Sequence, residues 1–275
     1  MNVTVVVTNY NGLEGLKGLL PGLIQGDYLN IYLVDDCSRD QSVAYAKGFQ
    51  KVAVIEGEKN VGPSGNRNRI LQEKDLGEVL WFIDADMELI TRNTGIVAER
   101  LFRDPKVAMV GGLIFNRNGK PMYWNYGFEK HPLRDRVAKF YGRLGKRFEQ
   151  NRKVHGFIRR RAIKYFYGVE IDAGNHQERV VEWVAEGSFL ARTDIFRKVG
   201  GFDEKMRYHE AHDICKRIRQ LGLIIKFSPE IVTRHLEIDC RDGGKPRDWK
   251  TGDQYFYKKH WGTPKNALKN FFRLG

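Results

Sequence analysis

The chain has 275 residues and a net charge of +13, with 41% hydrophobic and 12% aromatic residues. This length and composition can bury the core of one large α/β domain or two small ones, and they exclude a wholly disordered protein. No segment reaches the roughly 18–20 apolar residues of a membrane-spanning helix, and the first residues lack a secretory signal pattern. Three separated cysteines, Cys37, Cys215 and Cys240, indicate free thiols in a reducing compartment, so we expect a cytoplasmic protein.

The first 115 residues alternate short apolar runs with helix-like stretches. Strands are predicted at four apolar runs, 3–7, 31–34, 52–55 and 79–83. Helices are predicted between them, at 13–25, 40–49 and 63–72. Because the apolar runs lack polar alternation, they are typical of strands buried on both faces of a parallel sheet. The sequence therefore predicts a doubly wound α/β domain.

Polar residues follow the predicted strands at their carboxyl ends. Thr8 follows the first strand, Asp35 and Asp36 end the second, and Asp84 and Asp86 follow the fourth. Any one such residue is typical of a turn, but ligands of open α/β sheets bind in the crevice outside these ends. Polar residues at four strand ends in succession, two of them with paired acids, favour a site, and the acid oxygen atoms suit Mg²⁺ or Mn²⁺.

The third predicted helix opens with Asn-Val-Gly-Pro-Ser-Gly-Asn-Arg-Asn at residues 60–68. Two glycines permit close backbone approach, and a helix N-terminus attracts anions. The segment lacks the Gly-Lys-Ser/Thr ending of a P-loop and the Gly-x-Gly-x-x-Gly spacing of a dinucleotide fingerprint. The sequence therefore argues against nucleoside triphosphate hydrolysis and dinucleotide binding.

Regular patterning returns in the C-terminal third. A strand is predicted over 180–191, followed by a short helix over 193–199 with Thr193 as its N-cap. A helix is predicted over 210–220, and a strand over 223–227 is expected to stop at Pro229.

Six motifs in this order resemble family 2 glycosyltransferases of GT-A fold, and they are similar to rhamnosyl- and galactofuranosyltransferase-like members. They are VVVTNYNG (5–12), LVDDCSRD (33–40), NVGPSGNRN (60–68), FIDAD (82–86), WVAEGSFLAR (183–192) and VGGFDE (199–204). The resemblance covers about residues 2–120 and 180–240. It implies one GT-A α/β domain with a mostly parallel sheet. Its parts would be a nucleotide-sugar-binding half (1–118), a basic helical insertion (119–179), an acceptor-side half (180–240) and a C-terminal helical tail (241–275).

The same resemblance implies a metal-dependent, inverting glycosyltransferase. The donor would be a nucleoside-diphosphate sugar, most simply a UDP-sugar, and the acceptor a glycan or a lipid-linked molecule. Asp86 and His235 would hold Mn²⁺ or Mg²⁺. The residues implied to bind the nucleotide-sugar are Thr8, Tyr10, Asp35, Asp36, Asn60, Arg67, Asp84 and Gly187.

The general base is implied to lie in the segment 208–217. Asp213 matches an acid of the family pattern, but Ala211 stands where the family usually has the second acid of a pair. We expect Glu210 to act as the base and Asp213 to orient the helix, with His209 or His212 as substitutes. The alternative is a catalytically impaired protein that binds a nucleotide-sugar or nucleic acid. A nucleotidyltransferase, which would also place acids and a metal at strand ends, is a third interpretation.

Residues 130–168 contain thirteen Lys or Arg and two acids, and so carry +11 of the total charge, with aromatic residues interleaved. A solvated helical hairpin and a contact with an anionic membrane, at its cytoplasmic face, explain this segment about equally well. A funnel for acceptor or nucleotide is a third interpretation. Nucleic-acid binding ranks last, because the resemblance implies glycan or lipid-linked acceptors.

Overall fold

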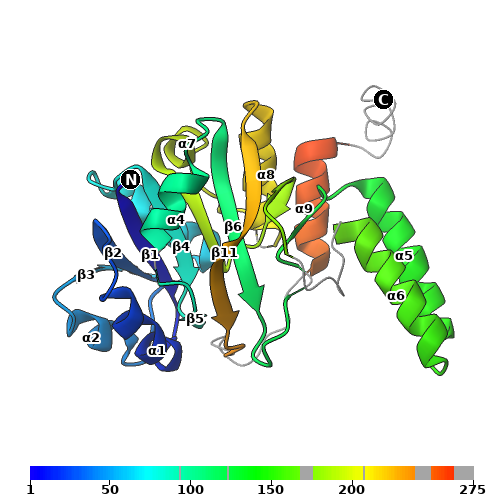
Figure 1. The fold of residues 1–275 in the computed structure, drawn as a ribbon, viewed down its shortest axis with the longest axis horizontal. Coiled ribbons are helices and arrows are strands. Elements are labelled where there is room, and N and C mark those ends of the chain that lie inside the picture. The colour runs from blue at the N-terminus through cyan, green and yellow to red at the C-terminus, as the bar shows by residue number, and fades with distance from the viewer. Residues whose placement is uncertain (93, 123, 168–175, 207, 239–248, 263–275) are drawn as a thin grey trace.

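The computed structural model describes residues 1–92, 94–122, 124–167, 176–206, 208–238 and 249–262. These residues form a central sheet with helices packed against it, and a helical hairpin projects from one side (Figure 1). Within these ranges, no helix is both long and apolar enough to span a bilayer. Cys37 and Cys215 are free thiols, as expected, and Cys240 lies outside the described residues.

The central sheet is mixed but mostly parallel in its N-terminal half. The order of its main strands is β3-β2-β1-β4-β10-β6-β11-β5, and β8 pairs with β11. Four parallel strands come first: β1 (Val3–Asn9), β2 (Asn30–Asp35), β3 (Val52–Glu56) and β4 (Val79–Asp84). The others are β5 (Met87–Leu89), β6 (Val107–Phe115), β8 (Arg179–Val181), β10 (Ser188–Arg192) and β11 (Ile224–His235). The predicted α/β fold is confirmed, with antiparallel β10 inserted between β4 and β6.

The helices packed on the sheet include all five predicted segments and two helices, α4 and α9, whose bounds were not predicted. They are α1 (Leu13–Leu23), α2 (Ser42–Lys47), α3 (Gly62–Asn68), α4 (Thr94–Leu101), α7 (Thr193–Lys198), α8 (Glu210–Gln220) and α9 (Trp249–Trp261). A 3₁₀ turn, η1 (Arg69–Gln72), continues α3. Strands β7 (Tyr126–Gly127) and β9 (Trp183–Val184) pair in a separate small sheet. The predicted bounds of the four parts remain predictions.

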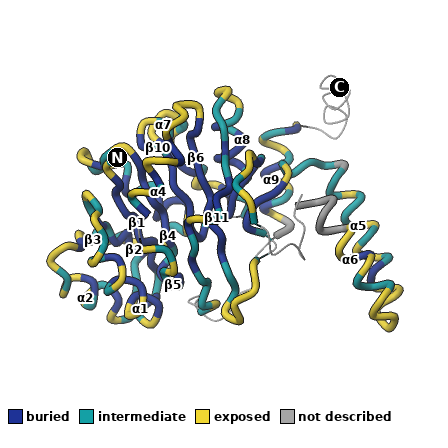
Figure 2. The backbone as a smooth tube through the Cα atoms, in the orientation of Figure 1, coloured by how far each residue is buried: buried dark blue, intermediate teal, exposed yellow. Residues whose placement is uncertain are grey.

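The core lies between the sheet and its helices, where the apolar strand runs are buried (Figure 2). Phe82 of β4 stacks on Phe189 of β10 with ring centroids 4.9 Å apart, so the antiparallel strand is packed as firmly as its parallel neighbours. This rigid base holds the loops at the carboxyl ends of β1, β2 and β4.

Three local predictions are wrong. The single strand predicted over 180–191 is divided into β8, β9 and β10, and β9 belongs to the separate small sheet. The strand predicted to stop at Pro229 continues as β11 to His235, with an irregular register against β6 between Phe227 and Val232. Proline has no N–H for the ladder, and a bulge tolerates that loss, so the strand resumes beyond it. Thr193 is the first residue of α7 and not its N-cap, which is Arg192.

The basic segment forms two antiparallel helices, α5 (Pro132–Arg147) and α6 (Arg152–Tyr167). They project away from the sheet (Figure 1), and much of their surface is exposed (Figure 2). Gly145 of α5 faces His155 and Ile158 of α6, which shows which sides of the two helices pack together.

Candidate functional site

Thr8 and Asp84 are brought together by the register of β1 and β4, which pairs these two residues at the carboxyl ends of their strands. The Thr8 hydroxyl donates a hydrogen bond to Asp84 Oδ1. The Asp84 side chain remains 29% exposed, so its carboxylate lies at the floor of the crevice and not in the core. Both residues were predicted to bind the nucleotide-sugar.

Arg67 of α3 is buried beside this pair. Its Nη2 donates to Asp84 Oδ1 at 2.7 Å, whereas Nε and Nη1 are buried with no partner among the described residues. Burial acts to lower the pKa of Arg67, but the charges of Asp84, Glu186 and Glu210 outweigh it and raise that pKa. Arg67 is therefore a fixed cation with donors left for a ligand.

Asp86 and His235 form a second pair. His235 Nε2 lies 3.1 Å from Asp86 Oδ2, and both side chains are largely buried. The β5–β11 register explains the contact, because it pairs His235 with Met87, the residue after Asp86. Burial acts to lower the pKa of His235, but the hydrogen bond and charge of Asp86 and the charge of Asp84 raise that pKa above 6.5.

The Asp86–His235 pair fits a divalent cation by its chemistry. A carboxylate oxygen and an imidazole nitrogen are ligands that Mn²⁺ accepts, and His235 Nδ1 is buried without a partner in the described part of the chain. Across that same part, no three His, Cys, Asp or Glu side chains gather closely enough to hold an ion. Any cation here would need oxygen atoms from a ligand or water.

Asp35 and Asp36 are buried and support the loops around the crevice. Asp35 accepts hydrogen bonds from Asn9 Nδ2 at 2.6 Å and from the Ser38 backbone N–H at 2.8 Å. Asp36 accepts from the backbone N–H groups of Val61 and Gly62, both at 2.8 Å. Asp35 therefore ties the end of β2 to β1 and to the loop that follows β2, and Asp36 ties it to the start of α3. Their predicted contacts with the nucleotide-sugar remain predictions.

The other predicted nucleotide-sugar residues lie around these loops. Tyr10 is half-buried just after β1, and Asn60 is exposed on the loop before α3. The carbonyl of Gly187, just before β10, accepts a hydrogen bond from the Asp84 N–H at 3.0 Å. Gly187 thus lies against the segment Asp84-Ala85-Asp86, and its predicted binding of the nucleotide-sugar remains a prediction.

Glu210, the predicted base, is the first residue of α8 and is only 5% exposed. Its charge raises the pKa of Arg67, so Glu210 and Asp84 act on the same guanidinium. Acids in the first turn of a helix are stabilised by the helix dipole. Ala211 is also buried, so its methyl group occupies the place of the expected second acid.

Asp213 holds α9 against α8. Its buried carboxylate accepts from His260 Nε2 at 2.7 Å and pairs with Arg217 at 2.8 Å and Lys259 at 2.6 Å. Burial acts to raise the pKa of Asp213, but the hydrogen bond from His260 and these positive charges lower it to about 2. These contacts agree with the predicted orienting role.

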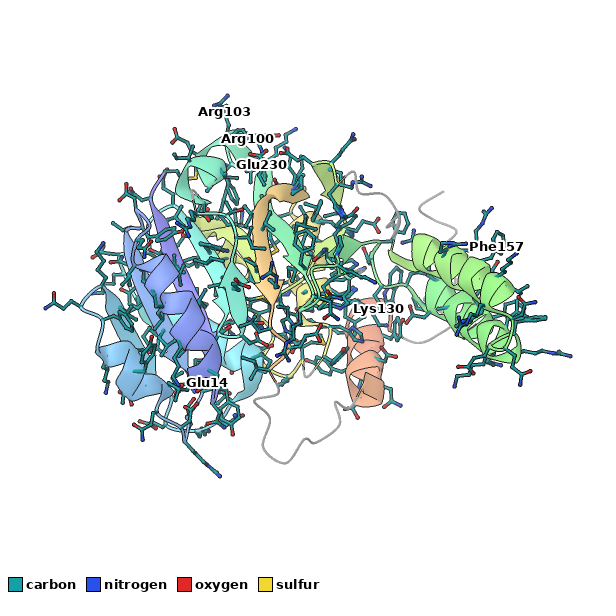
Figure 3. All side chains as sticks on the ribbon, turned by 60° about the horizontal axis from the view of Figure 1, so that its bottom comes forward. Glu14, Arg100, Arg103, Lys130, Phe157 and Glu230 are labelled. Carbon is teal, nitrogen blue, oxygen red and sulfur yellow. The ribbon has the colours of Figure 1, made fainter. Side chains whose placement is uncertain are left out.

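The two histidines proposed as substitute bases are both engaged. His209 Nε2 lies 2.7 Å from Asp253 of α9, which also pairs with Lys130 at 2.9 Å (Figure 3 shows Lys130 beside α9). The buried His212 ring stacks on Trp183 with centroids 4.1 Å apart, and burial keeps its pKa well below 6.5. The His209 ring is thus held by Asp253 and the His212 ring by Trp183, whereas Glu210 is buried at the start of α8.

Glu186 is a residue that the motif analysis did not single out. It precedes Gly187, its backbone carbonyl lies 3.5 Å from Arg67 Nη2, and its charge raises the pKa of Arg67. The available signal was its place in the WVAEGSFLAR motif, one residue before a predicted site residue. Glu186 is thus a second carboxylate that borders the crevice.

Comparison with known proteins identifies the family. Residues 4–166, more than half of the chain, match the model of glycosyl transferase family 2. The chain belongs to this family. It is 26% identical over 257 residues to a pre-mycofactocin glycosyltransferase of Mycobacterium tuberculosis. That alignment covers 90% of this family 2 chain and 44% of the relative, so the chain spans less than half the length of the curated relatives it matches.

Solved structures show the same fold. A structure of GalNAc-T7 with UDP, GalNAc and Mn²⁺ is 17% identical, with a TM-score of 0.65 over 96% of this chain and 49% of that chain. Staphylococcus aureus TarS with UDP-GlcNAc is 18% identical, with a TM-score of 0.55 over 88% and 60% of the chains. The mannosyltransferase PcManGT of Pyrobaculum calidifontis with GDP-Man and Mn²⁺ is 16% identical, with a TM-score of 0.55 over 100% and 76%.

Proposed function

We propose that this family 2 glycosyltransferase is metal-dependent and inverting, and that it transfers a sugar from a nucleoside-diphosphate donor to a glycan or lipid-linked acceptor. The observation that supports this most strongly is the juxtaposition of two pairs, Arg67 with Asp84 and Asp86 with His235, at one edge of the sheet. The first pair offers buried donors to an anion, and the second offers ligands to a cation.

Asp86 and His235 are the residues that would hold Mn²⁺ or Mg²⁺. A cation there supplies Lewis-acid neutralisation of the charge that develops on the leaving diphosphate. Two solved relatives of the same fold contain Mn²⁺ beside a nucleotide, which supports this assignment. Arg67 Nε and Nη1 would donate to the donor's phosphate oxygens, because a buried guanidinium with unpartnered donors gains most from an anion.

Thr8, Tyr10, Asp35, Asp36 and Asn60 would form the nucleoside side of the site. Thr8 would hold the Asp84 carboxylate toward the ribose through its hydroxyl hydrogen bond. Asp35 and Asp36 would act chiefly by fixing the loops, since their oxygen atoms already accept hydrogen bonds from within the chain. This division of roles follows from which carboxylates are exposed and which are buried.

Glu210 would accept the proton of the attacking hydroxyl on the acceptor side. Sugar transfer with inversion needs a base on the face opposite the leaving group, because the transition state resembles an oxocarbenium ion. The charges of Glu210 on α8 and of Asp84 on β4 both raise the pKa of Arg67, and Asp84 also accepts a hydrogen bond from Arg67. Asp213 would orient α8 through its ion pairs with α9.

A UDP-sugar is the donor that we favour, because the GalNAc-T7 and TarS structures contain UDP or UDP-GlcNAc. PcManGT contains GDP-Man, so a GDP-sugar belongs in the same test. The similarity to rhamnosyl- and galactofuranosyltransferase-like members remains a prediction, since the GalNAc-T7, TarS and PcManGT structures contain GalNAc, UDP-GlcNAc and GDP-Man. The acceptor is proposed only as a chemical class.

The test is release of nucleoside diphosphate by the purified chain, with and without Mn²⁺, across a panel of UDP- and GDP-sugars and mixed acceptors. Mn²⁺-dependent release from one donor is the expected result. A donor that raises the melting temperature but is never turned over would support the binding-only alternative, which the buried Ala211 favours. Release of pyrophosphate from a nucleoside triphosphate would identify a nucleotidyltransferase.

A further inference from the structure

The two helices of the projecting hairpin carry the same pattern of residues on their surfaces. In α5 the pattern is Arg136-x₃-Phe140-x₂-Arg143-x₃-Arg147, and in α6 it is Lys153-x₃-Phe157-x₂-Arg160-x₃-Lys164. Steps of four, three and four residues return to the same side of an α-helix. Each helix therefore has one stripe in which a phenylalanine stands among three cations, and we call these the α5 stripe and the α6 stripe.

The α5 stripe faces solvent and not the partner helix. Arg136, Phe140, Arg143 and Arg147 are all exposed, and the Phe140 side chain is 60% exposed. The side of α5 that meets α6 is marked by Gly145, two positions from Arg143 and therefore on a different side of the helix. Packing within the hairpin thus does not explain why a phenylalanine stands in this stripe.

The α6 stripe is exposed in the same way. Lys153, Phe157 and Arg160 are exposed, whereas the neighbouring Ile158 is buried against α5. Phe157 is 56% exposed and points outward from the hairpin in Figure 3, with the Arg161 guanidinium 5.3 Å from its ring centroid. Phe148 adds a third exposed ring at the tip, between the helices.

The two stripes face away from each other, because each lies opposite the side of its helix that packs on the partner helix. We propose that the α5 stripe, whose four side chains are all exposed, forms a docking surface for an anionic lipid membrane. Twelve Lys or Arg and two acids lie between Pro132 and Tyr167, so the hairpin is strongly positive and complements acidic headgroups. Exposed phenylalanines between cations suit the membrane interface, where rings enter the acyl boundary while the long basic side chains reach the headgroups. The hairpin would lie on the surface and not cross it.

A single-stranded nucleic acid is the competing polyanion, and the geometry favours it less. Base stacking uses aromatic rings that line a groove along which the strand runs. Phe140 and Phe157 stand on the sides of α5 and α6 that face away from the partner helix, so they do not line a groove between the helices. A flat, extended anionic surface fits such a convex hairpin better.

The hairpin is joined to the candidate site through charged contacts at its base. Asp135, in the first turn of α5, contacts Tyr257 of α9 and Lys130, which lies just before α5. Lys130 also pairs with Asp253 of α9. Asp253 in turn contacts His209, next to Glu210. A membrane bound by the hairpin would therefore hold the catalytic domain in a defined orientation, although the docking inference itself does not depend on the proposed transfer reaction.

The test is co-sedimentation of the full chain with phosphatidylcholine vesicles and with vesicles containing phosphatidylglycerol, at low and high salt. We expect binding to the anionic vesicles only, weakened by salt. The triple variant Arg136→Gln, Arg143→Gln, Arg147→Gln should bind these vesicles at least about tenfold more weakly. The variant Phe140→Ser should lose the binding that remains at high salt, whereas Phe157→Ser, on the opposite side of the hairpin, should keep it.

A matched control removes three cations elsewhere: Arg103→Gln, Lys198→Gln, Lys205→Gln. These residues are exposed on the catalytic domain, and Figure 3 shows Arg103 far from the hairpin. The control variant should bind anionic vesicles like the wild type, and circular dichroism should show every variant folded. Equal binding of the wild type to both vesicle types would overturn the proposal, as would equal losses in the triple and control variants. Tighter binding of a labelled single-stranded RNA than of anionic vesicles would assign the surface to nucleic acid.

The outcome is separable from the fate of the proposed function. Donor binding can be measured on the same preparations as a shift of melting temperature by UDP-sugars with Mn²⁺. The stripe variants should keep that shift, because the stripes lie outside the nucleotide crevice. Vesicle binding without any donor shift would uphold the docking surface and reject the transferase proposal.

Discussion

His235 Nε2 lies 3.1 Å from Asp86 Oδ2, and the two residues come from opposite halves of the sequence. The contact exists because β11 continues past Pro229 and pairs antiparallel with β5, the strand that begins directly after Asp86. A strand that stopped at Pro229 would leave Asp86 without this neighbour. The irregular register in β11 therefore matters for the candidate metal site and not only for the sheet.

We expect His235→Ala to weaken the apparent affinity for Mn²⁺ by about 10- to 100-fold, measured as the Mn²⁺ concentration that gives half-maximal donor binding. The reason is loss of one of two protein ligands at the proposed site. Arg234→Gln is the matched control, because Arg234 is adjacent in β11 but pairs with Glu88 at 2.7 Å. Equal Mn²⁺ requirements for wild type and His235→Ala would remove His235 from the metal site.

Gly15→Ala should displace the segment Asp84-Ala85-Asp86 from the side on which α1 packs. A Cβ at Gly15 of α1 would lie 2.2 Å from the Ala85 carbonyl oxygen and 2.9 Å from Asp86 Cα, so the turn must shift. We expect donor binding with Mn²⁺ to fall by about tenfold or more, since small displacements at a positioned site are costly.

Gly18→Ala in the same helix is the control for Gly15→Ala, because nothing lies within 4 Å of a Cβ at Gly18. Gly18→Ala should leave donor binding unchanged and should slightly raise the free energy of unfolding, since alanine favours helices more than glycine. Equal donor affinity in both alanine variants would show that the turn tolerates the added methyl group.

Glu210→Gln should lower kcat by at least about 100-fold with donor affinity nearly unchanged, because glutamine cannot accept the proton. Glu186→Gln is the informative comparison, since Glu186 also acts on Arg67. We expect Glu186→Gln to retain turnover within about tenfold of the wild type. Normal turnover in Glu210→Gln together with an inactive Glu186→Gln would transfer the role of base to Glu186.

Asp213→Asn should destabilise the fold by about 3 kcal/mol in urea unfolding, because it leaves buried cations without their counter-charge. The folded pKa of Asp213 is about 2, below the ordinary 3.8, so its stabilising contribution is complete above pH 4. That contribution is lost as the pH falls from about 4 to about 2, and the difference between wild type and Asp213→Asn should shrink over this window.

Asp194→Asn is the control for Asp213→Asn, since Asp194 is an exposed acid in the first turn of α7. Its loss should cost less than about 1 kcal/mol, the usual effect of a charge at a helix end. If Asp213→Asn unfolds at the same urea concentration as the wild type at neutral pH, its ion pairs with α9 do not stabilise the protein.

Much of the N-terminal half could be predicted because its signals are local. Unbroken apolar runs gave the four parallel strands, and the acids after β2 and β4 marked the edge where a ligand crevice forms. The predicted helix over 210–220 is α8 with the same bounds. In each case the pattern depends on residues a few positions apart, and the fold preserves it.

The separation of roles among the acids depended on contacts between distant residues. Asp35, Asp36, Asp84 and Asp86 look alike in the sequence, but only register and loop packing decide which carboxylates are buried. The contact of the Glu186 carbonyl with Arg67 also joins residues distant in the sequence. So does the pairing of β11 with β5 that brings His235 to Asp86. The sequence by itself determined the fold class, the family and the edge of the sheet that carries the site. Only the tertiary structure decided which acid meets Arg67 and which meets His235, because side-chain burial and pairing depend on strands and helices that the chain order does not bring together.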